Sequence, residues 1–200
     1  MLKEYQDVVL LHEVIPVKKR SYKLAHKYKE IVKTEIDNML TARIIYHVDQ
    51  SEWDSPMVVQ PKKHDPKKLR VCVDYKWLNK ATKTDPFPTP YADEILNEVA
   101  GHECYSFTDG FSGYSQVPIA KEDKHKTSFL CEFGSFAYRK MPFGLKNAPA
   151  VFSRTVVKAF QEYIYKSMGV YFDDYMIYNI MKDHIKWLRL MLERCRQIQL

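Results

Sequence analysis

Residues 169–178 read GVYFDDYMIY, two apolar half-strands joined at an acidic pair, Asp173 and Asp174. Aromatic and β-branched residues favour strands, and acidic residues are common in the turns between them. The stretch therefore predicts a β-hairpin. The acidic pair is either ordinary turn chemistry or a functional feature, because two adjacent carboxylates repel each other and are expected to be neutralised by a cation.

A third carboxylate ends another predicted strand. Residues 103–109 read ECYSFTD, and their last residue, Asp109, precedes Gly110. If neighbouring strands bring Asp109 beside Asp173 and Asp174, the three carboxylates form the kind of hard-oxygen site that Mg²⁺ prefers. Two such ions can activate an attacking hydroxyl group and stabilise a leaving pyrophosphate. The pattern therefore indicates nucleotidyl transfer.

Helical and strand patterns alternate irregularly along the rest of the chain. Apolar residues recur at spacings of three and four between residues 24 and 45, which is one face of a helix. Other helices are predicted at 91–99, 148–165 and 184–199, and other strands at 55–60, 69–75, 127–133 and 136–141. Because the order lacks a regular βαβ alternation, the predicted fold class is α+β.

Composition narrows the class of protein. Hydrophobic residues at 46% and charged residues at 28% are ordinary for a globular protein, which argues against disorder and coiled coil. The sequence has no apolar run of transmembrane length and no signal peptide at its start, so we expect an intracellular protein, cytoplasmic or nuclear, with no membrane partner. Four scattered cysteines without a Cys-x-x-Cys pair make a zinc site improbable. The net charge of +6 permits a nucleic-acid partner.

Five motifs in order resemble those of reverse transcriptases. They read WDSP (53–56), RVCVDY (70–75), FTDGFSGY (107–114), MPFGLKNAP (141–149) and YFDD (171–174). A lone YFDD would be weak evidence, but five ordered motifs are specific. The chain resembles gypsy-type LTR retrotransposons most, with DGFSGY similar to plant members, and the resemblance extends from about residue 22 onward.

The resemblance implies a right-hand polymerase fold consisting of fingers and palm, with an antiparallel palm sheet backed by helices. It implies fingers at 1–85 and 117–149 and palm at 86–116 and 150–200. The thumb is expected to be absent from this chain, as are the RNase H and integrase regions. These would belong to the remainder of a polyprotein.

For function, the resemblance implies an RNA-directed DNA polymerase whose partners are an RNA or DNA template with its primer and deoxynucleoside triphosphates. Asp109, Asp173 and Asp174 match the family's catalytic, metal-binding carboxylates, which hold two Mg²⁺ ions that Mn²⁺ can replace. The backbone carbonyl of Gly110 is the expected additional ligand, although many members carry a large apolar residue at this position.

The remaining expected contacts are to the nucleotide. Lys62 and Arg70 match fingers residues that hold the triphosphate, Tyr114 matches the residue beneath the sugar that excludes a 2′-hydroxyl, and Phe143 is expected near the nucleotide. Each has a plainer interpretation. A lysine near a hairpin tip is usually a solvated charge, with Lys63 an adjacent candidate, and Tyr114 and Phe143 could be core aromatics. His184 is interpreted as a helix-surface or packing residue.

Two other functions remain open from the sequence. The first is a retrotransposon-derived remnant that binds nucleic acid through its basic fingers without polymerising. The intact carboxylates favour the enzyme, and the expected lack of a thumb favours the remnant. The second is a nuclease or transposase of the RNase H type, which also uses three acidic residues. It is the weaker alternative because the acidic residues of such enzymes are normally dispersed, whereas Asp173 and Asp174 are adjacent.

Overall fold

The computed structural model describes residues 5–62, 65–110 and 113–198, with backbone only at 61–62 and 65–68. The helices are η1 (His26–Tyr28), α1 (Lys29–Thr41), α2 (Lys76–Ala81), α3 (Ala92–Val99), η2 (Gly113–Gln116), η3 (Lys124–Thr127), α4 (Ala148–Phe160) and α5 (Met181–Ile198). The strands are β1 (Ile45–His47), β2 (Ser55–Lys62), β3 (Asp65–Val73), β4 (Cys104–Asp109), β5 (Phe129–Cys131), β6 (Gly134–Tyr138), β7 (Met168–Tyr171) and β8 (Asp174–Asn179). The mixture confirms the α+β fold class.

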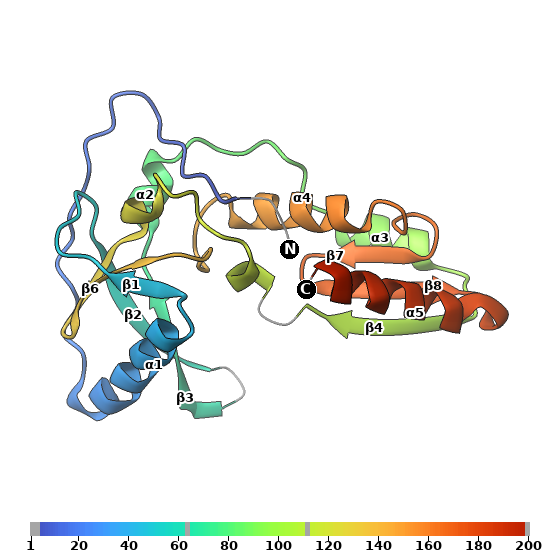
Figure 1. Cartoon of the computed structure of the whole chain (residues 1–200), viewed down its shortest axis with the longest axis horizontal. Coiled ribbons are helices and arrows are strands. Elements are labelled where there is room, and N and C mark those ends of the chain that lie inside the picture. Colours follow the sequence, from blue (N-terminus) through green and yellow to red (C-terminus); the bar gives the residue numbers. More distant parts are fainter. Residues whose placement is uncertain (1–4, 63–64, 111–112, 199–200) are drawn as a thin grey trace. The chain divides into compact units, whose positions relative to one another are not determined.

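The described residues form two compact units (Figure 1). Unit 1 comprises residues 85–117 and 149–198, and unit 2 comprises residues 5–84 and 118–148, each apart from the gaps given above. The chain therefore leaves unit 2, builds the first part of unit 1, and returns to complete unit 2. None of the helices formed by the described residues combines the length and apolar character needed to cross a membrane.

Unit 2 is built on a five-stranded sheet in the order β1-β6-β5-β2-β3. Neighbouring strands are antiparallel except β2 and β5, which are parallel. The apolar stripe of α1 buries Val32 and Ile36, and the inner strands bury Phe129 and Phe136. The N-terminal segment is part of this unit, because the backbone N–H of Val8 donates to Oδ2 of the buried Asp123 at 2.7 Å.

Unit 1 contains a three-stranded antiparallel sheet in the order β4-β8-β7. Alternation along β8 sends Tyr175 and Ile177 to one face, where the ring of Tyr175 lies 5.6 Å from that of Phe160 in α4. On the same face α5 contacts β4 through a hydrogen bond between His184 of α5 and Ser106 of β4, whose Nε2 and Oγ atoms are 2.8 Å apart. The other face is partly covered by α3, whose Ile95 and Val99 form a buried cluster with Tyr178. Helices therefore pack on both faces of this sheet, and the acidic residues lie at one end of it.

Candidate active site

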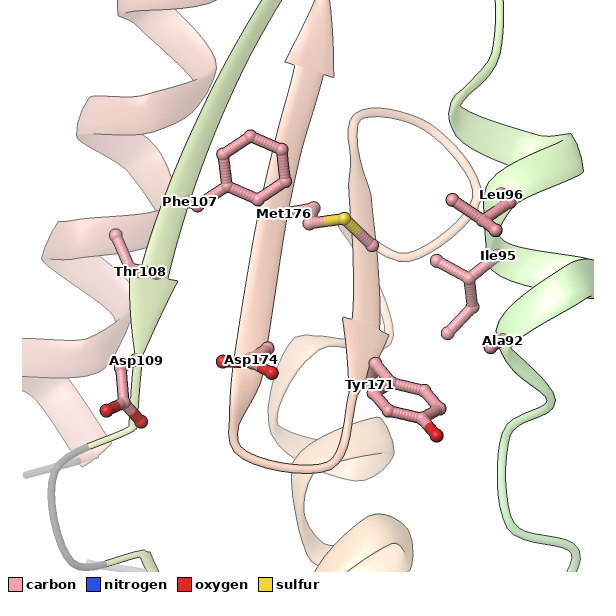
Figure 2. A pocket seen from close by; sticks show the side chains of 9 residues that line it. All are labelled: Ala92, Ile95, Leu96, Phe107, Thr108, Asp109, Tyr171, Asp174 and Met176. Atoms are coloured by element: carbon pink, nitrogen blue, oxygen red, sulfur yellow. The ribbon is translucent and has the colours of Figure 1, made fainter. Parts of the chain in front are cut away.

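Main-chain pairing brings the three acidic residues to one end of the unit 1 sheet. Asp109, the last residue of β4, is paired with Asp174, the first residue of β8, and their side chains lie on the same face (Figure 2). Asp173 lies in the turn between β7 and β8, where Phe172 has a positive φ of 52°. The N–H of Gly110 donates to the backbone oxygen of Asp173 at 2.6 Å. The end of β4 and the hairpin turn are therefore fastened together.

Asp173 has an unfavourable electrostatic environment for an ionised carboxyl group. Its Oδ1 atom is buried and has no hydrogen-bond partner among the described residues. Burial raises the pKa of this carboxyl group, and the negative charges of Asp109 and then Asp174 raise it further. The three acidic groups therefore repel one another here, and a cation would relieve the repulsion.

The residues at this end of the sheet fit a hard divalent cation. In the side-chain conformations described, no group of three or more His, Cys, Asp or Glu residues converges on a single ion position. The backbone nevertheless places Asp109 opposite Asp174, and a hydrogen bond joins the N–H of Gly110 to the backbone oxygen of Asp173. Unpaired carboxylate oxygens are the ligands that Mg²⁺ and Mn²⁺ prefer. The carbonyl of Gly110, the other expected ligand, accepts a hydrogen bond from the N–H of Gly113 at 3.3 Å.

Tyr114 lies beside the acidic residues. It belongs to η2, is half-buried, and its ring meets that of Phe152 edge to face with centroids 5.1 Å apart. Burial raises the pKa of its hydroxyl group, and the charge of Asp173 adds to the effect. A Cβ atom at Gly113 would lie only 2.5 Å from the Phe152 ring and 3.3 Å from Oδ1 of Asp173, so glycine is needed for this close packing.

A pocket of about 520 Å³ opens beside Asp109 and Asp174 on the sheet face that carries α3 (Figure 2). The two carboxylates lie at one end, and Phe107 and Met176 lie farther along the same two strands. Phe107 is 71% exposed, which leaves an apolar surface next to the acidic residues. The other lining residues are Ala92, Ile95, Leu96, Thr108 and Tyr171.

The other expected nucleotide-binding residues belong to unit 2. Arg70 is exposed on β3, opposite Gln60 of β2. Lys62 is the last residue of β2, and its side chain, like all of Lys63, lies outside the described residues. Phe143 is 64% exposed, so it is not a core aromatic of its unit. The structure thus brings Asp109, Asp173, Asp174 and Tyr114 together in unit 1.

Two supporting residues were not identified from the sequence. Tyr175 lies directly under the acidic turn, and Phe152 supports Gly113 and Tyr114. The alternation of β8 could have indicated that Tyr175 points inward, but not that it meets the backbone at Gly110. His184, expected as a surface or packing residue, is 7% exposed and is a packing residue bonded to Ser106.

Comparison with known proteins identifies the chain's relatives. Residues 60–200 match the family described as "Reverse transcriptase (RNA-dependent DNA polymerase)". The chain is 29% identical to the retrovirus-related Pol polyprotein from transposon 412 of Drosophila melanogaster, over 98% of this chain and 16% of that protein. It is 40% identical to an RNA-directed DNA polymerase homolog of Oenothera berteroana, over 62% of this chain and 91% of that protein. With the enzymatic polyprotein of Cauliflower mosaic virus (strain Strasbourg), identity is 37% over 65% of this chain and 19% of that protein.

Solved structures share the fold. The foamy viral protease-reverse transcriptase in complex with an RNA/DNA hybrid superimposes with a TM-score of 0.85 at 23% identity, over 96% of this chain and 25% of that one. The same protein in complex with dsDNA gives a TM-score of 0.86 at 23% identity, over 99% of this chain and 40% of that one. The chain spans about a sixth of the Drosophila polyproteins it matches.

Proposed function

The chain belongs to the reverse transcriptase (RNA-dependent DNA polymerase) family, and on that premise we propose that it transfers deoxynucleotides onto a primer 3′-hydroxyl at Asp109, Asp173 and Asp174. In this reaction the hydroxyl group gives up its proton to solvent and its oxygen bonds to the α-phosphorus of the triphosphate. The bond from the α-phosphorus to the oxygen that bridges to the β-phosphorus breaks, and pyrophosphate leaves. The observation that carries the proposal is the pairing of Asp109 with Asp174, with Asp173 fastened to the same end of the sheet.

We propose that the three carboxylates hold two Mg²⁺ ions, which Mn²⁺ can replace, with the Gly110 carbonyl as a further ligand. When bound, such ions activate the attacking hydroxyl group and stabilise the leaving phosphate oxygens. The chain's own residues orient the ligands. The bond from Gly110 to Asp173 fixes the backbone, and the unpaired Oδ1 of Asp173 is free to bind a cation.

We propose roles in nucleotide recognition for four further residues. Tyr114 would lie beneath the sugar and exclude a 2′-hydroxyl group, which is supported by its position beside Asp173 and its edge-to-face packing on Phe152. Lys62 and Arg70 would hold the triphosphate, because charge accumulates on phosphoryl oxygens during transfer. Phe143 would contact the nucleotide, which its exposure permits.

We further propose that unit 2 is the fingers and unit 1 the palm of the polymerase, and that RNA or DNA template with its primer is the partner of both. The foamy viral protein with which the fold is shared has been solved with an RNA/DNA hybrid and with dsDNA. We assign the chain to a gypsy-type LTR retrotransposon of a plant and expect it to act as part of a Pol polyprotein. The transposon Pol polyproteins of Drosophila melanogaster among its relatives support membership of a Pol polyprotein.

Primer extension tests the proposal directly. The chain is joined to the downstream part of a related polyprotein and supplied with a primed homopolymer template, dNTPs, and Mg²⁺ or Mn²⁺. We expect metal-dependent extension that falls by at least about a hundredfold in Asp109→Asn, consistent with the loss of a group that stabilises transition-state charge. Extension that survives this substitution would refute the assignment. Binding of primed template, weakened by salt, without any extension would support the nucleic-acid-binding remnant instead.

A further inference from the structure

Tyr175 is a buried residue whose polar group lacks a partner. It follows Asp174 in β8, is 2% exposed, and packs its ring on Phe160. Its hydroxyl oxygen is buried and makes no hydrogen bond to any described residue. Two tyrosines buried to the same degree behave differently, because Tyr75 donates to the Thr127 carbonyl at 2.9 Å and Tyr178 donates to Glu98. A buried hydroxyl without a partner is costly to the fold, so this one calls for an explanation.

The Tyr175 hydroxyl lies under the backbone that joins the acidic residues. A Cβ atom at Gly110 would be 2.9 Å from the hydroxyl oxygen and 3.2 Å from the Asp173 backbone oxygen. The phenol therefore fills the space that a side chain at residue 110 would need. Gly110 directly follows Asp109, and its N–H is bonded to Asp173. The hydroxyl thus lies where the chain carrying Asp109 meets the turn carrying Asp173.

The hydroxyl group is a hydrogen-bond donor in the same site as a buried acceptor that lacks a partner among the described residues. A tyrosine hydroxyl group carries one hydrogen that it can donate. The other buried polar atom of this site without a partner is Oδ1 of Asp173, an acceptor. Hydrogen bonds from a neighbouring group orient carboxylate ligands in metal sites and increase metal affinity.

We propose that Tyr175 is a positioning residue of the metal site, whose hydroxyl donates a hydrogen bond to the Asp173 carboxylate in the cation-bound protein, directly or through one water molecule. This inference rests on the proposed function. It gives the buried hydroxyl a role that packing does not require, since phenylalanine would fill the same volume. It also explains why residue 110 is glycine in this chain.

The test compares Tyr175→Phe with Tyr75→Phe, a matched removal of one buried hydroxyl in unit 2 that has a partner. Thermal unfolding is measured without metal, and Mn²⁺ affinity is measured by electron paramagnetic resonance of the free ion. We expect Tyr175→Phe to leave the melting temperature unchanged or higher and to weaken Mn²⁺ binding about tenfold, as loss of a ligand-orienting hydrogen bond does. Tyr75→Phe should lower the melting temperature, because it leaves the Thr127 carbonyl unpaired, and should bind Mn²⁺ normally.

Two results would overturn the inference while leaving the proposed function standing. One is wild-type Mn²⁺ affinity in Tyr175→Phe, and the other is a fall in its melting temperature as large as that of Tyr75→Phe, which would show that the hydroxyl serves the fold. Asp109→Asn distinguishes failure of the proposed metal site from failure of the proposed role of Tyr175. If the wild-type chain binds no Mn²⁺, or if Asp109→Asn binds it equally well, the metal site itself fails and the role of Tyr175 fails with it.

Discussion

Asp109 and Asp174 are directly opposite each other across two antiparallel strands, at the last pair of the β4–β8 ladder. Their proximity is produced by backbone pairing, so it does not depend on either side chain. Substituting one carboxylate should therefore remove a proposed metal ligand without disturbing the fold.

We expect Asp109→Asn and Asp174→Asn each to weaken Mn²⁺ binding by at least about tenfold with a melting temperature close to that of the wild type, because a neutral amide is a poorer ligand for a hard cation. Asp49→Asn, an exposed aspartate of unit 2, is the control. Titration of Mn²⁺ followed by spectroscopy gives the affinities. Equal affinity in all three variants would show that these carboxylates bind no ion.

Asp173 should make the metal-free protein less stable as pH rises. Its pKa is raised in the folded state, by burial first and then by Asp109 and Asp174, so the folded protein holds this proton more tightly than the unfolded chain. Stability is therefore lost from the ordinary pKa of 3.8 upward, through the raised folded value. Asp173→Asn should melt at a temperature higher by about 2 °C at pH 7, a small gain because solvent screens a half-buried group.

Melting curves of the wild type and Asp173→Asn between pH 3 and pH 8 measure this difference. The gain should disappear below pH 3.8. It should also shrink when Mg²⁺ is added, since the proposed cation would neutralise the carboxylate of the wild type, which the variant lacks. A variant that is less stable than the wild type at pH 7 would contradict the direction of the shift.

Gly113→Ala should disrupt the support of Tyr114, because the new methyl group would overlap the fully buried Phe152 ring at 2.5 Å. We expect a loss of about 1–3 kcal/mol in the free energy of unfolding, measured with urea. Phe152→Leu should relieve part of this overlap. The double variant should therefore lose less free energy of unfolding than the two single variants added together.

Gly101→Ala is the matched control for the combination of Gly113→Ala with Phe152→Leu. Its backbone has a φ of 83°, but no atom lies within 4 Å of the added methyl group. Its cost should come from the backbone alone and should not respond to Phe152→Leu. If the cost of Gly113→Ala simply adds to that of Phe152→Leu, the two residues are not in the close contact described.

Arg154 should stabilise unit 1 in a manner that depends on pH. Its guanidinium group donates to both oxygens of Asp85, at 3.2 and 2.9 Å, and fastens the start of this unit to α4. The hydrogen bond from Arg154 is the main cause that lowers the pKa of Asp85. The stabilisation is thus complete above the unfolded pKa of 3.8 and is lost as pH falls through the lowered folded value.

Arg154→Met should cost about 1–2 kcal/mol in the free energy of unfolding at pH 7 and clearly less at pH 2.5, as measured with urea. The control is Arg189→Met, which removes an exposed arginine of α5. An equal cost for Arg154→Met at both pH values would mean that packing of the arginine, and not its ion pair, stabilises the unit.

The hairpin that bears the acidic turn was predictable, because its strands are apolar, β-branched and aromatic on both sides of a polar pair. The strand ending at Asp109 was predictable for the same reason. The helix predicted over residues 24–45 was too long, since α1 ends at Thr41 and the chain continues into β1. The reversal uses Arg43 with a positive φ of 55°, where no glycine or asparagine marks a helix end.

Short elements and long-range contacts were harder to predict. Helix α2 has six residues, too few for an apolar period, and its start is marked only by the Asp74 side chain, which accepts from the Lys76 N–H at 3.0 Å. The helix predicted over 148–165 ends at Phe160. The contact between Tyr175 and Gly110 depends on which strand lies beside which, and strand patterns in a sequence indicate faces rather than neighbours.

The strand order β4-β8-β7 also affects how the protein folds during synthesis. Among the described strands, β4 pairs only with β8, which is translated later. Sixty-seven residues separate Thr108 of β4 from Tyr175 of β8. At about 5–20 residues per second, β4 waits roughly 3 to 13 seconds for that neighbour, with its backbone groups and Phe107 open to other chains. Completion of unit 2, which ends at residue 148, falls within this interval. We therefore expect unit 2 to fold before unit 1 during synthesis, because Asp109 is translated several seconds before Asp174.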